Sequence, residues 1–392
     1  MSPRLPPRQA ERRGLRLWPV GTVLVLAFAT AALAASAVFY AGWNLLDAHG
    51  LKPERRIDSK TLFDLVKLAF GVVAGAGALV ALVVAYRRQR VDEDGALRDA
   101  TRLHTERFTT AVSQLGDDSA AVRLGGVHAL AGLADDAPTR ALRQTCIDVL
   151  CAYLRLPYTA EADLPPSNAE ARHAYLALRE VRHTVIRLIR DHLRLAIEDH
   201  HSWRGHDLDF TGVTFDGGDF SDAVFSGGTA DFSGATFSGG TVDFRRVRFS
   251  GSLVDFGKAT FTSGLVDFGS ATFADGMVAF ESATFSGGTV DFRVARFSGG
   301  AVGFNNATFS GSMVHFNAAR FSGSVVAFDE TTFSGGTVNF RVARFSGSTV
   351  NFDNATFSGS TVDFSGAQGA APHGLVPVGA PVPSGLILTT AW

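Results

Sequence analysis

Phenylalanine recurs at fixed intervals through the C-terminal half of this 392-residue chain, and 27 of its 32 phenylalanines lie between Phe210 and Phe364. The first four, up to Phe225, are spaced five residues apart. From there the gaps alternate between seven and five residues, so the repeat unit is twelve residues long. A short, constant period over such a length is typical of near-identical coils stacked along one axis.

The residue two places before a ladder phenylalanine is small or aliphatic, as in Val242 before Phe244 and Ala271 before Phe273. A period of two puts both side chains on one side of an extended segment. A helix is excluded, because its apolar residues would recur at intervals of three and four. Glycine and serine at every second junction provide the corners. We predict a buried ladder that includes Phe244, Phe249, Phe268, Phe273, Phe292, Phe297, Phe316, Phe321, Phe340 and Phe345.

The start of this stretch resembles the pentapeptide-repeat family, whose five-residue unit has a small residue two places before a central Leu or Phe. The segments Leu208-Asp-Phe210, Val213-Thr-Phe215 and Ala223-Val-Phe225 match that unit. The resemblance implies a right-handed, four-sided β-solenoid with one unit on each side. From Phe225 onward the sequence departs from the motif, because two residues are inserted at alternate corners.

This departure leaves two coil lengths open. A four-sided coil would contain two repeat units (a 24-residue coil), and a flattened coil would contain one (a 12-residue coil). Exposed positions alternate in chemistry, which favours the longer coil. One series takes its members from every second unit and contains Thr236, Thr260, Thr284, Thr308, Thr332 and Thr356. The interleaved series contains Arg248, Thr272, Arg296, Arg320 and Arg344. Duplication of a 24-residue gene unit would produce the same alternation in a 12-residue coil.

The N-terminal region contains two apolar stretches long enough to span a bilayer. Residues 18–46 include no charged residue, and the second stretch is closed by Arg87, Arg88 and Arg90. Basic residues at both outer ends predict a cell-membrane protein with two spans and both termini in the cytoplasm. The connecting loop is basic too, which weakens this orientation. Gly71 and Gly75 form a small-xxx-small pattern that would pack the two spans together or pair two protomers.

Between the spans and the solenoid, the periodicity predicts four helices. The first covers Ala96–Leu115, Ser119 and Pro138 begin the next two, and Ser167 or Asn168 caps a long basic helix that ends near His200. Glu106–Leu115 followed by Val122–Leu130 resembles a helical segment found between a transmembrane hairpin and pentapeptide repeats in bacterial membrane proteins.

The predicted fold class is a multidomain α+β chain with a transmembrane helical hairpin, an α-helical module and a four-sided β-solenoid of 12-residue half-coils. Its segments are a basic cytoplasmic arm (1–17), a first transmembrane helix (18–43), a short loop (44–61), a second transmembrane helix (62–86), a soluble α-helical module (87–205), the solenoid (206–366) and a tail rich in Gly, Pro and Ala (367–392). We expect Leu386–Leu388 to fold back over the last coil, whose open edge would otherwise pair with another chain.

No nucleotide-binding, zinc-protease or serine-hydrolase motif is present, so we expect neither enzymatic activity nor a cofactor. Cys146 and Cys151 are interpreted as buried free thiols. The residues His192, His200, His201 and His206 gather near Asp199 at the junction between helix and solenoid. A metal site is one interpretation of this cluster. The favoured one is a polar helix end whose cationic side chains oppose the helix dipole, with no metal.

Surface charges on the solenoid repeat with the coil. The candidate interaction surface contains Arg245, Arg248, Arg293, Arg296, Arg320, Arg341 and Arg344. Within this set, Arg245, Arg293 and Arg341 each directly follow a phenylalanine of every second repeat unit. In the intervening units, the residue that directly follows the phenylalanine is Glu281, Asn305, Asp329 or Asp353. We hypothesise one arginine-bearing side and a separate Asp/Asn-bearing side. The alternative is that these charges serve only solubility.

The favoured function is a non-enzymatic, membrane-anchored scaffold that presents a rigid rod to an unidentified cytoplasmic protein. The first alternative is a regulator of a nucleic-acid enzyme, because some pentapeptide-repeat proteins imitate duplex DNA and bind gyrase. Aspartates recur at Asp243, Asp255 and Asp267, but arginines interrupt them and the net charge is only −2, which argues against a nucleic-acid role. The second alternative is a homo-oligomeric structural element of the membrane, joined through Gly71 and Gly75 or through the rod ends.

Overall fold

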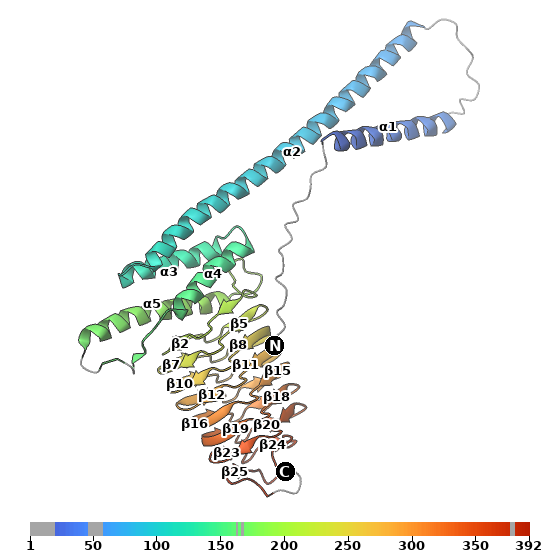
Figure 1. Ribbon diagram of the computed structural model, residues 1–392. Coiled ribbons are helices and arrows are strands. Elements are labelled where there is room, and N and C mark those ends of the chain that lie inside the picture. The colour runs from blue at the N-terminus through green and yellow to red at the C-terminus, as the bar shows by residue number, and fades with distance from the viewer. Residues whose placement is uncertain (1–19, 46–57, 162–163, 166–167, 377–380) are drawn as a thin grey trace. The chain divides into compact units, whose positions relative to one another are not determined.

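A computed structural model describes residues 20–45, 58–161, 164–165, 168–376 and 381–392 (Figure 1). The chain divides into two compact units, Met1–Asp99 and Ala100–Trp392. Helix α2 (Ser59–Leu115) runs through the boundary between them. The predicted basic arm (1–17), most of the predicted loop (44–61), and Ser167 lie outside the described residues.

The first unit contains α1 (Val20–Leu45) and the apolar part of α2. Among the described helices, α2 is the one that is long and apolar enough to cross a membrane. In α1 the apolar stretch Phe28–Ala41 is shorter than a span. One candidate span is therefore found where the sequence predicts two, and the two-span hairpin is not shown.

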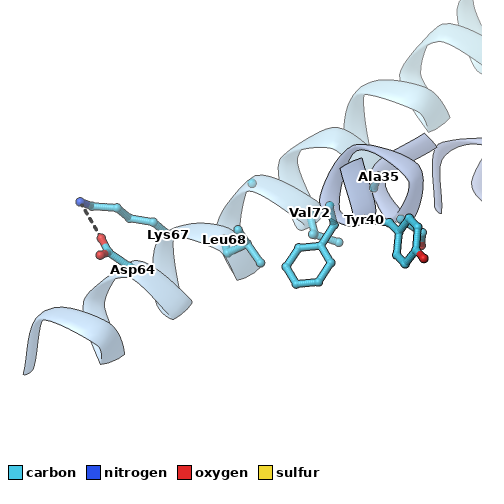
Figure 2. A pocket seen from close by; sticks show the side chains of 9 residues that line it. Ala35, Tyr40, Asp64, Lys67, Leu68 and Val72 are labelled. Carbon is cyan, nitrogen blue, oxygen red and sulfur yellow. Dashed lines mark ion pairs between the residues drawn. The ribbon is translucent and has the colours of Figure 1, made fainter. Parts of the chain in front are cut away.

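A hollow of about 920 Å³ lies between α1 and α2 within this unit (Figure 2). At its edge Asp64 and Lys67 form an ion pair at 3.5 Å. Gly71 lines the hollow, but a Cβ atom at Gly71 or Gly75 would meet no atom of the described chain within 4 Å. Neither glycine therefore makes a close contact there, and their role in helix packing or protomer pairing stays a prediction.

Helix α2 is continuous for 57 residues, which corrects the prediction of a separate helix that begins at Ala96. The intervening residues 87–95 are mostly charged or polar, and those with long side chains form helices readily. Gln89 donates to Glu93 one turn later, at 3.1 Å, so the polar segment continues the helix. The predicted end at Leu115 is confirmed, since Gly116 follows the last helical residue.

Three shorter helices complete the module: α3 (Ala120–Asp135), α4 (Arg140–Arg155) and α5 (Ala169–Arg194). Their shared core contains Val127, Leu130, Ile147, Leu150, Val185 and Ile189, all fully buried. A Cβ atom at Gly126 would lie 2.6 Å from the backbone nitrogen of Leu115, so glycine lets α3 approach α2 closely.

Helix ends follow the sequence only in part. The Asn168 side chain accepts from the backbone N–H of Ala171 at 2.9 Å, which confirms Asn168 as the cap of α5. Ser119 precedes α3 but makes no capping hydrogen bond through its side chain. Helix α5 ends at Arg194, about two turns before the predicted His200. The guanidinium of Arg204 donates to the carbonyls of Leu193 and Arg194, so it terminates the helix there.

The solenoid is built from two parallel sheets (Figure 1). The first sheet contains β1 (Leu208–Asp209), β4 (Val224–Phe225), β5 (Thr229–Asp231), β8 (Arg248–Asp255), β11 (Thr272–Ala279), β14 (Arg296–Phe297), β15 (Ala301–Gly303), β17 (Arg320–Phe321), β18 (Val325–Ala327), β20 (Arg344–Phe345), β21 (Thr349–Asn351) and β24 (Gln368–Gly369). The second sheet contains β2 (Thr214–Phe215), β3 (Gly218–Asp219), β6 (Thr236–Phe237), β7 (Thr241–Asp243), β9 (Thr260–Phe261), β10 (Leu265–Asp267), β12 (Thr284–Phe285), β13 (Thr289–Asp291), β16 (Thr308–His315), β19 (Thr332–Asn339), β22 (Thr356–Phe357), β23 (Thr361–Asp363) and β25 (Leu386–Ile387).

Strand register decides the coil length. Val242 pairs with Val266 and Val266 with Val290, so each residue pairs with its equivalent two repeat units later. The 24-residue coil is therefore confirmed and the 12-residue alternative is wrong. The first coil is shorter, because the segment from Thr214 to its partner Thr236 contains only one of the inserted corners. One phenylalanine of each coil stacks on its equivalent in the next coil, in a column of seven rings from Phe220 to Phe364. The solenoid therefore has about seven turns.

Each coil contributes four phenylalanines, one to each of four stacked columns. Within the column that contains Phe268, Phe292 and Phe316, neighbouring ring centroids are 4.7–4.9 Å apart and the ring planes differ by 2–4°. Rings of this column meet those of a second column edge to face, as Phe280 meets Phe292 at 86°. Every predicted ladder residue from Phe244 to Phe345 is buried, with at most 4% of its surface exposed.

Both ends of the solenoid are covered by the chain itself. At the first coil, α5 packs against β3 and β4, and α4 packs against β1. At the last coil, β25 pairs with β23, which agrees with the expected fold-back of Leu386–Leu388. The Trp392 ring packs on Phe364 at 5.4 Å and its Nε1 donates to the carbonyl of Gly369. The predicted irregular tail thus contains a strand and a cap.

Candidate interaction surface

Four predicted surface arginines stand in one line on the first sheet. The strand pairings place Arg248, Thr272, Arg296, Arg320 and Arg344 on successive coils. We call Arg248, Arg296, Arg320 and Arg344 the arginine ladder. All four side chains are exposed, and no described carboxylate lies within 4 Å of their guanidinium groups. Successive coils are about 4.8 Å apart, as in any pair of hydrogen-bonded strands, so Arg248 and Arg296, which flank Thr272, are about 9.6 Å apart.

The other three predicted arginines are engaged within the solenoid. Arg245 donates to Asp243 at 3.0 Å, and Arg293 donates to Asp291 at 2.6 Å. Arg341 lies 4.0 Å from Asp363. The hydrogen bond that Arg245 donates to Asp243 raises the pKa of Arg245, and the one that Arg293 donates to Asp291 raises the pKa of Arg293. Arg245 and Arg293 therefore neutralise carboxylates of one column at this corner.

That column consists of Asp219, Asp243, Asp267 and Asp291, which pair in register on the second sheet. Asp291 is buried, and the other three are half-buried. Burial, together with the neighbouring carboxylates of Asp291 and Asp243, raises the pKa of Asp267. Like charges one coil apart repel one another. Arg245 offsets this repulsion, because it donates to Asp243 and also lies 3.9 Å from Asp267.

The acidic set lies at a different corner of the coil. Glu281, Asn305, Asp329 and Asp353 each follow a ring of the column Phe280, Phe304, Phe328 and Phe352. Arg245, Arg293 and Arg341 follow rings of the column that meets it edge to face. The two sets are thus spatially separate, as the two-side hypothesis requires. Whether either side binds a partner stays a prediction.

Aspartates that would imitate phosphates instead stabilise the corners. In eight units the Asp Oδ1 accepts the backbone N–H two residues later, at 2.6–3.0 Å, at Asp209, Asp219, Asp231, Asp243, Asp255, Asp267, Asp291 and Asp363. Such Asx turns direct the carboxylate into the bend. The aspartates therefore give no support to DNA mimicry.

The junction histidines do not form one cluster. His192 stacks on Trp203 with centroids 4.1 Å apart, and its Nε2 lies 3.0 Å from the Asp135 carboxylate. His206 Nδ1 lies 2.9 Å from Gln144, and burial together with Arg140 and Arg143 lowers the pKa of His206 to about 4. Among the described residues, one group could hold a metal ion, and it consists of Asp199, His200 and His201. Asp199 and His200 are exposed.

The predicted thiols are buried and free, which confirms their interpretation. Burial raises the pKa of Cys146 to about 11 and that of Cys151 to about 12, so neither thiol is activated as a nucleophile. His104 lies 3.8 Å from the sulfur of Cys146, but its own pKa is lowered by burial.

Sequence reasoning missed a buried polar cluster where α5 meets the first coil. The Asp216 carboxylate accepts from the hydroxyls of Tyr158 and Tyr175, both at 2.6 Å, and lies 3.7 Å from His183. Burial alone would raise the pKa of Asp216, but His183 and the two tyrosines outweigh it and lower the pKa to about 2. The sequence contained a signal for this site, because Asp216 follows Phe215 directly and breaks the repeat pattern. In every later unit the residue after the equivalent phenylalanine is Ser, Thr or Ala.

Arg182 anchors the same junction. It is 3% exposed, lies 4.1 Å above the ring of Tyr158, and donates to the carbonyls of Leu154 and Thr214, both at 2.7 Å. One side chain therefore connects α4, α5 and the first coil. This cluster has a structural role, because it closes the N-terminal end of the solenoid.

Comparison with known families agrees with this geometry. Residues 206–245 match the family model described as pentapeptide repeats (9 copies). This part of the chain is similar to pentapeptide repeats and forms the first coils of the solenoid. The match covers the first coils, where the five-residue spacing is regular, and the register shows that the later coils continue the same solenoid with 12-residue half-coils. No curated protein and no solved structure matches the chain.

Proposed function

We propose that the chain is a membrane-associated scaffold without catalytic activity, whose pentapeptide-repeat solenoid binds another protein along its side. The observation that carries this proposal is that the chain closes both ends of its own solenoid, with α4 and α5 at one end and Trp392 at the other. The long sides remain as the surface for a partner. Four unpaired arginines on one side favour a specific contact over simple solubility.

We also propose that α1 and the apolar part of α2 form a two-span membrane hairpin with both termini in the cytoplasm. Helix α2 provides the candidate span, and α1 is a 26-residue helix without a charged residue. The partner is then a cytoplasmic protein. Two reporters fused after Trp392 test the orientation. Green fluorescent protein should fluoresce there, because the C-terminus is expected in the cytoplasm. An alkaline phosphatase fusion that is active would contradict this orientation, because the enzyme is active only after export.

The scaffold proposal is tested by site-specific photo-cross-linking of the full-length chain in its own cells. A photoreactive phenylalanine replaces Thr272 on the first sheet, Thr308 on the second sheet, or Gln114 on the helical module, and cross-linked proteins are identified by mass spectrometry. A defined protein captured from a solenoid position is the expected result. Capture from Gln114 alone moves the function to the helices, and no capture at any position rejects the scaffold.

A further inference from the structure

The arginine ladder has an apolar neighbour on the same sheet. The pairings place Leu253, Met277, Ala301 and Val325 on successive coils, and we call these residues the apolar ladder. Leu253, Met277 and Val325 are 45%, 40% and 48% exposed. Strand β8 contains both Arg248 and Leu253, and β11 pairs with it through Thr272 and Met277, so a cationic line and an apolar line follow the solenoid axis together. Asp275, at the bend between them, is an exposed carboxylate.

The opposite sheet lacks this combination. Its equivalent positions hold the threonines Thr236, Thr260, Thr284, Thr308, Thr332 and Thr356, all in register. Both sheets have the same backbone, so backbone geometry alone does not require arginine on the first sheet. The difference marks the first sheet as the binding side.

We propose that the first sheet binds an acidic amphipathic helix of the partner protein, laid along the solenoid axis. The carboxylates of that helix pair with the arginine ladder, and its apolar stripe covers the apolar ladder. This inference rests on the proposed scaffold function and names the chemistry of its partner.

The spacing favours a helix over an extended segment. Arg296, Arg320 and Arg344 repeat at about 4.8 Å, and Arg248 lies two coils before Arg296, whereas same-side residues of an extended strand are about 6.7 Å apart. A helix advances about 5.4 Å per turn, so acidic residues one turn apart stay within reach of successive arginines. Four coils separate Arg248 from Arg344, a length of about 19 Å that a helix of about 13 residues covers.

The residue types favour carboxylates of a protein over a lipid surface. All four cations are arginines, whose planar fork binds a carboxylate or a phosphate through two parallel hydrogen bonds, so the neighbouring apolar residues distinguish the two. Interfacial membrane binding relies on Trp, Phe and Leu in an apolar stripe, but no aromatic residue occurs in either ladder.

The test measures binding of a fluorescent helical peptide to the full chain in nanodiscs of neutral lipid, by fluorescence anisotropy. The peptide has about four helical turns with a glutamate stripe beside a leucine stripe. The triple variant Arg296→Gln, Arg320→Gln, Arg344→Gln should bind about tenfold more weakly than the parent protein. The matched control Thr284→Gln, Thr308→Gln, Thr332→Gln changes the same three coils on the opposite sheet and should bind as the parent does. Circular dichroism checks that both variants keep the solenoid.

Three results would overturn the inference. The first is equal peptide binding by the two triple variants. The second is that a peptide in which every glutamate is replaced by glutamine binds the parent protein as tightly as the glutamate peptide does. The third is co-sedimentation of the chain with phosphatidylserine vesicles that depends on the arginine ladder while the peptide does not bind, which would assign the ladder to lipid.

The same variants separate this inference from the scaffold function. If photo-cross-linking from the solenoid captures a partner and the triple arginine variant still captures it, the scaffold stands and the helix inference fails. If the peptide binds through the arginines but no cellular protein cross-links at any position, the chemistry of the surface is supported and the scaffold fails.

Discussion

The ring of Phe292 lies parallel to the ring of Phe316 one coil later, with centroids 4.7 Å apart and planes that differ by 2°. The same ring is parallel to Phe268 on the other side, at 4.9 Å. Phe292 is fully buried, so every direction around it is filled by protein. A column of this kind couples each coil to its two neighbours and to no others.

Replacement of Phe292 with alanine should therefore destabilise the solenoid locally, by about 3–5 kcal/mol. Hydrogen exchange measured by mass spectrometry should show lost protection from Phe268 to Phe316, with protection retained around Phe220. Phe292→Leu keeps most of the volume and should cost about 1–2 kcal/mol. Equal loss of protection over the whole solenoid after Phe292→Ala would contradict nearest-neighbour coupling.

Val294 occupies a corner with a backbone φ of 62°, a left-handed conformation that β-branched residues rarely adopt. Its side chain is 48% exposed, so little packing offsets the strain. Left-handed backbone costs a residue with a Cβ atom about 1–2 kcal/mol. Val294→Gly relieves this strain, but glycine loses more conformational entropy on folding, which offsets part of the gain. The free energy of unfolding should therefore rise by up to about 1 kcal/mol. Thermal unfolding followed by circular dichroism measures this change.

Gly234 provides the reciprocal control, because it occupies the equivalent corner with φ 65° and a Cβ atom there would meet nothing within 4 Å. Gly234→Val should lower the free energy of unfolding by about 1–2 kcal/mol through backbone strain alone. Changes of the same sign in the two variants would show that side-chain contacts decide these corners.

The carboxylate of Asp216 should make the junction between α5 and the first coil sensitive to acid. Its pKa is lowered from 3.8 to about 2, so the stabilisation is complete above pH 3.8 and disappears as the pH falls toward 2. A difference of this size corresponds to about 2 kcal/mol. Asp216→Asn should lower the unfolding free energy at neutral pH and remove the dependence between pH 4 and about 2. Denaturant unfolding across this pH range measures both effects.

Asp231→Asn is the control for this prediction, because Asp231 is a half-buried corner residue whose Oδ1 accepts the backbone N–H of Ser233 within the solenoid. If Asp216→Asn keeps the full acid dependence of the parent protein, the paired carboxylate is not its source.

The Phe spacing was enough to predict the buried ladder, because a period of two leaves one choice for which side chains face inward. The 24-residue coil was favoured by a different signal, the alternation of exposed Thr and Arg positions. The pairing of Arg245 with Asp243, two residues earlier, was not predicted, because Arg245 was assigned to the exposed interaction surface. The helices were harder. The end of α5 depends on Arg204, ten residues after Arg194, and the cluster around Asp216 joins residues as far as 58 positions apart. Local periodicity contains no information on such contacts.

Trp392 should protect the last coil from self-association. Its ring covers Phe364 and Phe345, at 5.4 and 5.8 Å, and its Nε1 holds the carbonyl of Gly369 in the last strand of the first sheet. Trp392→Ala would expose these rings beside the open strand edge, and such an edge pairs readily with another chain. We expect association that increases with protein concentration, measured by sedimentation velocity in detergent. His373→Ala is the control, because His373 lies at the same end with its side chain 75% exposed and covers no ring of the columns. A Trp392→Ala protein that sediments like the parent protein at every concentration would show that β25 alone closes the solenoid.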